Sequence, residues 1–126
     1  MIKIILDTNF LIYCAENKID YVESIMGLME EGYELSVPSL VVKELEEISK
    51  NADKLSDRDG AKLALKLLKY NNVKILNING RYADDAIINF VKKNGAIVAT
   101  LDIELRNKLR KFRKIVIEGK RKLVWE

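Results

Sequence analysis

Acidic side chains occur in the sequence at positions from which they could act together. Asp7 directly follows the apolar run Ile2–Leu6, and Asp102 follows shortly after a second apolar run, Ala96–Ala99. The carboxyl ends of parallel strands meet at one edge of a sheet, so we expect both aspartates at that edge. Each of them could instead do no more than cap the helix that follows it, because aspartate is a favoured N-cap residue.

Glu44 is a less ordinary acid, because its neighbours on a predicted helix are apolar. Leu40, Val41 and Ile48 lie three or four residues away from it, on the same side of that helix. We therefore expect the Glu44 carboxylate to point toward the inside of the protein. A carboxylate in such a place needs a cation beside it, or it must hold a proton.

Asp84 and Asp85 open another predicted helix, where the helix dipole favours acidic residues. Adjacent residues of a helix point about 100° apart, so at most one of the two can face a shared centre squarely. The sequence leaves open which of them lies nearer to Asp7 and Asp102.

The residue types that the chain lacks limit the chemistry of such a cluster. It has no histidine and a single cysteine, Cys14. A Ser-His-Asp or Cys-His catalytic device, a histidine-ligated zinc site and an internal disulfide are therefore excluded. Clustered carboxylates repel one another, and Mg²⁺ or Mn²⁺ are hard ions that oxygen ligands suit. Such an ion lowers the pKa of a water and stabilises charge on a phosphoryl oxygen, which suits phosphodiester hydrolysis.

Charge is distributed unevenly along the chain. Residues 1–105 carry 13 Lys or Arg and 17 Asp or Glu, a net charge of −4, whereas residues 106–126 carry 9 and 2, a net charge of +7. A basic end on an acidic body is a footprint of polyanion binding, and an ordinary solvated surface can show it too. The basic side chains expected to contact a phosphate backbone are Arg106, Lys108, Arg110, Lys111, Arg113 and Lys114.

A fold must position these residues, and the apolar pattern predicts strands alternating with helices. The expected strands are Ile2–Leu6, Glu34–Val37, Val73–Leu76, Ala96–Ala99, Lys114–Ile117 and Leu123–Trp125. The expected helices cover residues up to about 31 (capped by Asn9 or Asp20), 39–50, 58–70, 83–93 and 101–111, with a polar loop at 51–57. This order predicts an α/β fold with a mainly parallel central sheet and helices on both faces.

The length of 126 residues fits one domain, which we expect to cover residues 1–126. Apolar residues make up 48% and charged residues 33% of the chain, as in soluble globular proteins. No apolar run approaches the roughly 18 residues of a membrane span, and the N-terminus lacks the basic head of a signal peptide. We therefore expect a cytoplasmic protein with no membrane contact.

Taken together, these motifs resemble those of the PIN-domain nucleases. The similar stretches are Asp7-Thr8-Asn9, Val37-Pro38 followed six residues later by Glu44, Asp84-Asp85-Ala86-Ile87, and Ala99-Thr100-Leu101-Asp102. They occur in the order typical of the family and span residues 2 to about 117. The resemblance implies a PIN-like three-layer α/β domain and a metal-dependent endoribonuclease centre that uses Mg²⁺ or Mn²⁺.

The resemblance also assigns roles by position. The acids that match the catalytic quartet of the family are Asp7, Glu44, Asp85 and Asp102. Asp85 is preferred because Asp85-Ala86-Ile87-Ile88 matches the usual helix opening, and Asp84 is the alternative. The resemblance implies that the aspartates hold the metal, while Glu44 completes the site or orients a water. The supporting polar groups would be Thr8, Asn9 and Thr100.

Two branches of the family are similar to this chain. Tyr82-Ala83-Asp84-Asp85 and Arg110-Lys111 resemble PIN nucleases that process pre-ribosomal RNA, whereas the short length resembles a VapC toxin of a toxin–antitoxin pair. The resemblance implies RNA as the substrate, an antitoxin or a ribosome-assembly protein as a partner, and pairing into a homodimer. The alternative function is a non-catalytic PIN module that binds RNA or a ribosome-assembly partner. A receiver-like or phosphatase-like domain is disfavoured because Asp7 opens no DxDx motif, and the chain has no P-loop or GxGxxG.

Overall fold

The central sheet has six strands in the order β3-β2-β1-β4-β5-β6. The computed structural model describes the whole chain, residues 1–126. The first five strands run parallel to their neighbours, and the last forms an antiparallel hairpin with β5. The strands are β1 (Ile2–Leu6), β2 (Tyr33–Pro38), β3 (Lys74–Leu76), β4 (Ile97–Ala99), β5 (Lys114–Glu118) and β6 (Lys122–Trp125).

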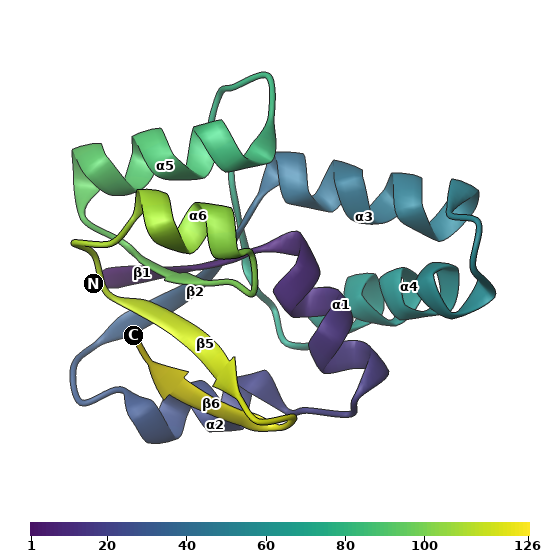
Figure 1. Cartoon of the computed structure of the whole chain (residues 1–126), viewed down its shortest axis with the longest axis horizontal. Coiled ribbons are helices and arrows are strands. Elements are labelled where there is room, and N and C mark those ends of the chain that lie inside the picture. Colours follow the sequence, from purple (N-terminus) through teal and green to yellow (C-terminus); the bar gives the residue numbers. More distant parts are fainter.

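Helices cover both sides of this sheet. They are α1 (Thr8–Glu16), α2 (Tyr21–Leu28), α3 (Ser39–Asn51), α4 (Leu55–Tyr70), α5 (Ala83–Asn94) and α6 (Ile103–Lys108). In Figure 1, α5 and α6 lie above the strands and α2 lies below them, while α3 and α4 extend together to the right. The predicted α/β fold with a mainly parallel sheet is therefore confirmed. No helix in the structure is both long and apolar enough to cross a membrane.

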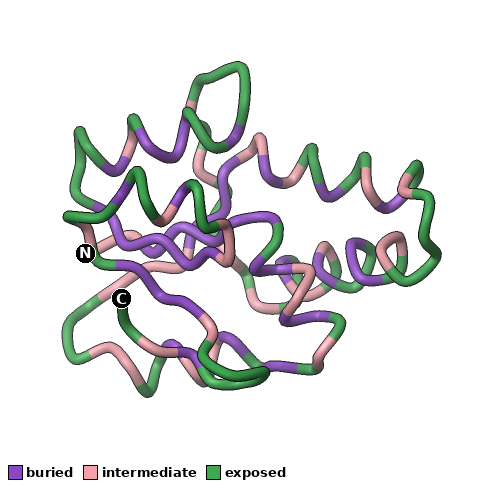
Figure 2. The backbone as a smooth tube through the Cα atoms, in the orientation of Figure 1, coloured by how far each residue is buried: buried purple, intermediate pink, exposed green.

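Strand β1 lies at the centre of the sheet, which explains its apolar sequence. Ile4, Ile5 and Leu6 have no exposed surface, as expected for a strand that is covered on both faces. Figure 2 shows the buried segments concentrated along the inner strands. Leu6 is the register partner of Ala99 in β4, so the chain leaves both strands side by side at the same edge. This pairing determines where the acidic residues meet.

The helical stretch expected to run to about residue 31 is in fact two helices. Asp7 is the N-cap of α1, whereas Asn9 lies inside that helix. Lys18 has a left-handed backbone conformation with φ of 54°, which no α-helix can continue. Asp20 then caps α2 by accepting a hydrogen bond from the N–H of Glu23 at 3.1 Å. The expectation of one helix was wrong because an apolar pattern alone does not reveal this turn.

Two further helix boundaries differ from the expected ones. Helix α4 begins at Leu55, inside the expected polar loop, and Asp57 lies in its first turn, where the helix dipole favours an acid. Helix α6 ends at Lys108 instead of residue 111. The side chain of the buried Lys114 donates hydrogen bonds to the carbonyl oxygens of Leu109 (2.9 Å) and Phe112 (2.7 Å), so this lysine holds the chain in a turn after α6.

Candidate active site

Asp7 is a buried acid held by hydrogen bonds at the carboxyl edge of the sheet. Asp7 is only 3% exposed. Its Oδ1 accepts the N–H of Thr8 at 2.9 Å, and its Oδ2 accepts the hydroxyl of Thr100 at 2.7 Å. The Thr100 oxygen in turn accepts the N–H of Asp102 at 3.1 Å, so its proton is free to point at Asp7. This chain of donors links the end of β1 to the end of β4.

The charge on Asp7 is costly for the fold. Burial raises the pKa of its carboxyl group, and the nearby charge of Asp102 raises it further. The hydrogen bonds from Thr100 and Thr8 oppose this rise in the pKa by stabilising the ionised form. Burial therefore disfavours the ionised form of Asp7, and the two hydrogen bonds reduce that penalty.

Asp102 does cap the helix that follows it, as the simpler interpretation predicted. Its Oδ1 accepts the N–H groups of Glu104 (2.9 Å) and Leu105 (3.3 Å) at the start of α6. The same carboxyl group also acts on Asp7 and on Asp84, because its charge raises the pKa of both. Capping and membership of the acidic group therefore coexist in this residue.

Glu44 lies at the rim of this group instead of pointing into the protein interior. The residue is exposed on α3, so the expectation of an inward-facing carboxylate was wrong. Its Oε2 accepts a hydrogen bond of 3.3 Å from the hydroxyl of the buried Thr8. Partial burial and the charges of Asp7 and Asp84 raise the pKa of Glu44, and the bond from Thr8 opposes that rise. The helical neighbours of Glu44 correctly indicated its side of the helix but not its depth.

Of the two adjacent aspartates, Asp84 is the one that lines the groove beside Glu44. Burial raises its pKa from 3.8 to about 6, and the charges of Asp7 and Asp102 add to the rise. Asp85 adds repulsion to Asp84, but it is not among the groups that shift the pKa of Asp7 or Glu44. These features favour Asp84, the alternative, while Asp85, which the family's helix opening favours, stays a prediction.

The four grouped acids are therefore Asp7, Glu44, Asp84 and Asp102. No lysine or arginine is among the groups that shift the pKa of Asp7, Glu44 or Asp84. Their donors are all carboxylate oxygens, the chemistry that Mg²⁺ and Mn²⁺ suit. In this conformation, however, no three acidic side chains lie close enough to enclose a metal ion. The donor set fits such an ion chemically, and the exposed side chains of Glu44 and Asp84 would have to move toward it.

The basic residues expected to contact phosphate are mostly engaged with other groups. Lys114 is only 2% exposed and its ammonium group binds backbone carbonyls, so it cannot contact a nucleic acid. The remaining engaged pairs are Arg106 with Glu126, Lys108 with Glu104 at 3.7 Å, and Arg113 with Glu31 at 2.9 Å. Arg110 and Lys111 are exposed and form no ion pair.

A groove beside the acids contains Lys43 and Arg81, which the sequence analysis did not single out, and Tyr82, which it named only within a stretch that resembles one branch of the family. It has a volume of about 640 Å³ and is lined by Glu44 and Asp84, together with Lys43, Arg81 and Tyr82. The only available signal was the position of the Arg81-Tyr82 pair immediately before the acidic start of α5.

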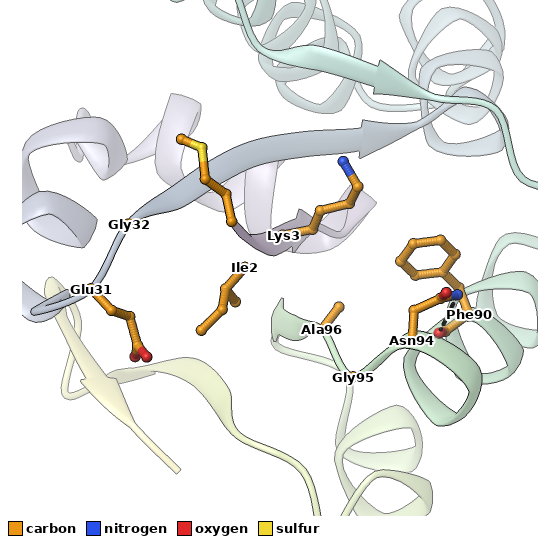
Figure 3. A pocket seen from close by; sticks show the side chains of 9 residues that line it. Ile2, Lys3, Glu31, Gly32, Phe90, Asn94, Gly95 and Ala96 are labelled. Carbon is orange, nitrogen blue, oxygen red and sulfur yellow. Dashed lines mark hydrogen bonds between the residues drawn. The ribbon is translucent and has the colours of Figure 1, made fainter.

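Another pocket, of about 480 Å³, lies at the opposite end of the strands. It is lined by Ile2 and Lys3 at the start of β1 and by Gly95 and Ala96 before β4 (Figure 3). None of the four grouped acids lines it, so it is separate from the candidate site.

Fold and site together define an α/β domain with an acidic group at the carboxyl edge of a parallel sheet. The family model described as "PIN like domain" matches residues 4–122, and the chain belongs to this family. The resemblance to PIN domains is thus confirmed.

Relatives within the family include proteins with different roles. Ribonuclease VapC4 of Methanocaldococcus jannaschii is 39% identical over 110 residues, covering 86% of this chain and 83% of that protein. The rRNA-processing protein FCF1 of Saccharomyces cerevisiae is 29% identical over 113 residues, covering 87% of this chain and 55% of that protein. The chain therefore spans about half the length of FCF1.

Solved structures confirm the fold. The PIN domain endonuclease Utp24 superposes with a TM-score of 0.74 at 25% identity, covering 96% of this chain and 90% of that chain. VapBC2 from Rickettsia felis, solved with a DNA fragment, has a TM-score of 0.57 at 13% identity, and covers 93% of this chain and all of that chain. At this low identity, the second likeness concerns the fold alone.

Proposed function

We propose that this protein is a metal-dependent endoribonuclease that hydrolyses RNA phosphodiester bonds at Asp7, Glu44, Asp84 and Asp102. The observation that carries the proposal is that these acids come from separate elements and meet at one edge of the sheet, where Thr8 links Asp7 to Glu44 and Thr100 links Asp7 to Asp102, and where Asp7 and Asp102 raise the pKa of Asp84. A group of this kind needs cations or captured protons to persist. Family membership and the likeness to a ribonuclease and an endonuclease support the reaction type.

The aspartates of the group would hold Mg²⁺ or Mn²⁺. We propose Asp7, Asp84 and Asp102 for this role, with Asp84 replacing the Asp85 favoured by the motif. A bound divalent ion supplies a water of lowered pKa and stabilises charge on the phosphoryl oxygens.

The side chains around the acids have roles of their own in this proposal. Thr100 keeps the Asp7 carboxylate oriented and ionised, because its hydroxyl donates to Oδ2 at 2.7 Å. Thr8 holds Glu44 at the rim through its hydroxyl, so that Glu44 can orient the attacking water or accept a proton from it. The N–H groups of Glu104 and Leu105 fix Asp102 in place. Asn9 is exposed on the first turn of α1, from where it can meet substrate.

RNA would be bound through basic side chains near the C-terminal end. Arg106 and Arg110 line a groove of about 400 Å³ at α6, the helix that Asp102 caps. The other lining residues are Ile103, Asn107, the buried Lys114 and Glu126, the partner of Arg106. Lys111, Lys108 and Arg113 extend this basic surface, whereas the ammonium group of the buried Lys114 is bound to backbone carbonyls. Much of the affinity should weaken with salt, because phosphate contacts release counterions.

The relatives point to two different cellular roles. The likeness to ribonuclease VapC4 favours a VapC-type toxin with an antitoxin partner, whereas the likeness to FCF1 favours rRNA processing with a ribosome-assembly partner. Pairing into a homodimer and a cytoplasmic location remain part of the proposal. A non-catalytic RNA-binding module is the alternative, and retention of the full acidic group argues against it.

Cleavage of single-stranded RNA in Mn²⁺ tests the proposal directly. Asp7→Asn should lower the cleavage rate at least about 100-fold, since it removes a charge from the catalytic centre. The variant should still fold, because an asparagine oxygen can accept one of the two hydrogen bonds and the costly charge is gone. Cleavage that survives both Asp7→Asn and EDTA would refute the proposal, and RNA binding without any cleavage by the wild type would favour the non-catalytic alternative.

A further inference from the structure

We propose that the groove beside Glu44 and Asp84 binds a nucleotide of single-stranded RNA next to the cut phosphate, with its base stacked on Tyr82. Lys43 and Arg81 would then contact the backbone phosphate of that nucleotide. This inference rests on the proposed endoribonuclease function and adds a substrate-binding residue to it.

Tyr82 is held at a fixed place relative to the acidic group. It is the N-cap of α5, two residues before Asp84, and its carbonyl oxygen accepts the N–H of Ala86 at 3.1 Å. The preceding loop packs tightly on the same helix, because a Cβ added at Gly80 would lie 2.8 Å from the Cβ of Ala86. A base bound to Tyr82 would therefore have a defined position with respect to Asp84.

The Tyr82 side chain has no structural role that explains it. It is 60% exposed, and it makes no hydrogen bond to cap α5. Its one recorded aromatic contact is with the Arg81 guanidinium, whose central carbon lies 5.6 Å from the ring centroid. Exposed aromatic rings with an adjacent arginine are what single-stranded nucleic-acid binders use, because every base has a face that can stack.

Size and charge of the groove also fit a nucleotide. Its volume of about 640 Å³ lies within the roughly 300–1,000 Å³ typical of small-molecule sites. Glu44, Glu47 and Asp84 form its acidic part, and the cut phosphate would meet the metal-binding acids beside Glu44 and Asp84. Lys43 and Arg81 provide positive charge on the same lining, suited to the adjacent phosphate.

Tyr70 provides a matched control. It is 81% exposed at the end of α4, and it lines a different groove with apolar residues of α1 and α4, such as Cys14 and Leu67. The effect of losing an exposed tyrosine ring can therefore be compared between Tyr82, which borders Glu44 and Asp84, and Tyr70, which does not.

The first measurement is the affinity for a fluorescein-labelled single-stranded oligoribonucleotide, in an Asp7→Asn background that prevents turnover. Tyr82→Ala should weaken binding roughly 5- to 150-fold, the range expected for one lost base–aromatic stack. Tyr82→Phe should retain the affinity, and Tyr70→Ala should not change it. Melting temperatures should stay unchanged in all three variants, because both tyrosines are exposed.

The second measurement replaces single bases of a cleavable RNA by abasic nucleotides and compares cleavage by the wild type and Tyr82→Ala. At one position near the cut, the loss of cleavage caused by the abasic nucleotide and the loss caused by Tyr82→Ala should not be additive, because both changes delete the same contact. If the wild type cleaves RNA and Tyr82→Ala binds and cleaves it equally well, this inference is overturned but the proposed function is not. Effects that are additive at every abasic position would also overturn this inference. Absence of any RNA binding and cleavage by the wild type would overturn the proposed function as well.

Discussion

The clearest quantitative test concerns the repulsion that Asp84 experiences. Its pKa is raised from 3.8 to about 6, first by burial and then by Asp7 and Asp102. At neutral pH the folded protein therefore holds a negative charge that the unfolded chain holds more cheaply. Asp84→Asn removes that charge and should stabilise the metal-free protein.

The magnitude follows from the linkage between pKa and folding. A rise in the pKa from 3.8 to about 6 corresponds to about 3 kcal/mol of lost stability at pH 7 if the whole shift is expressed. Asp84 is an exposed residue, so solvent screens its interactions, and we expect about 1 kcal/mol. That gain corresponds to a rise of about 4 °C in melting temperature for a chain of this size.

The sign of the pH dependence is determined by the same shift. Between pH 4 and pH 6 the folded state binds more protons at Asp84 than the unfolded chain does, so this residue lowers stability as pH rises. Below about pH 4 the carboxyl group is protonated in the folded state and its penalty is absent. The advantage of Asp84→Asn should therefore be present at pH 7 and lost at pH 4.

Urea unfolding in EDTA at both pH values measures this effect, with Asp85→Asn as the matched control. Asp85→Asn should give a smaller gain at pH 7, because Asp85 is not among the groups that raise the pKa of Asp7 or Glu44. Adding Mn²⁺ at 100 times its dissociation constant should stabilise the wild type by about 2.7 kcal/mol and the Asp84→Asn variant by less. No gain at pH 7, or an equal gain from both variants, would refute the assignment of Asp84 to the acidic group.

Two further predictions concern the supporting side chains. Thr100→Ala should destabilise the fold by about 1–3 kcal/mol and reduce cleavage, because it leaves the buried Asp7 carboxylate without its 2.7 Å hydrogen bond. Thr100→Ser keeps the hydroxyl and should therefore show wild-type stability in unfolding assays and wild-type rates in cleavage assays. Glu126→Gln should free Arg106 from its ion pair, so RNA binding should become tighter and more dependent on salt. Stability should change by no more than about 1 kcal/mol, because surface ion pairs contribute little. Unchanged RNA affinity in Glu126→Gln would exclude Arg106 from the RNA contact.

Much of the fold could be predicted from local pattern. The apolar run before Asp7 gave the central strand, and the strand–helix order gave a mainly parallel sheet. Helix boundaries were less predictable where a single residue decides them. Lys18 turns the chain with a positive φ, and Lys114 closes the turn after α6 by folding its side chain back onto the carbonyl oxygens of Leu109 and Phe112, which the apolar pattern does not reveal.

The sequence by itself determined which chemistry is open to this protein. Without histidine and with one cysteine, the chemistry had to use carboxylates, lysines, hydroxyls or a metal held by oxygen ligands, and the order of the motifs indicated the family. The register of β1 with β4 then decided that Asp7 meets Thr100 and Asp102. Asp7 and Thr100 are 93 positions apart in the chain, so the hydrogen bond between them depends on strand pairing and not on local sequence.

Only the tertiary structure showed that Asp84 lines the groove beside Glu44 and that Glu44 lies at the surface. Adjacent helical residues differ by about 100° in direction, so a small rotation of α5 decides which carboxylate joins the group. Likewise, the exposure of Glu44 depends on how α3 sits against its neighbours, and the partner of Arg106 is an acid from the last residue of the chain. These outcomes depend on the packing of whole elements, which residue types and spacing do not specify.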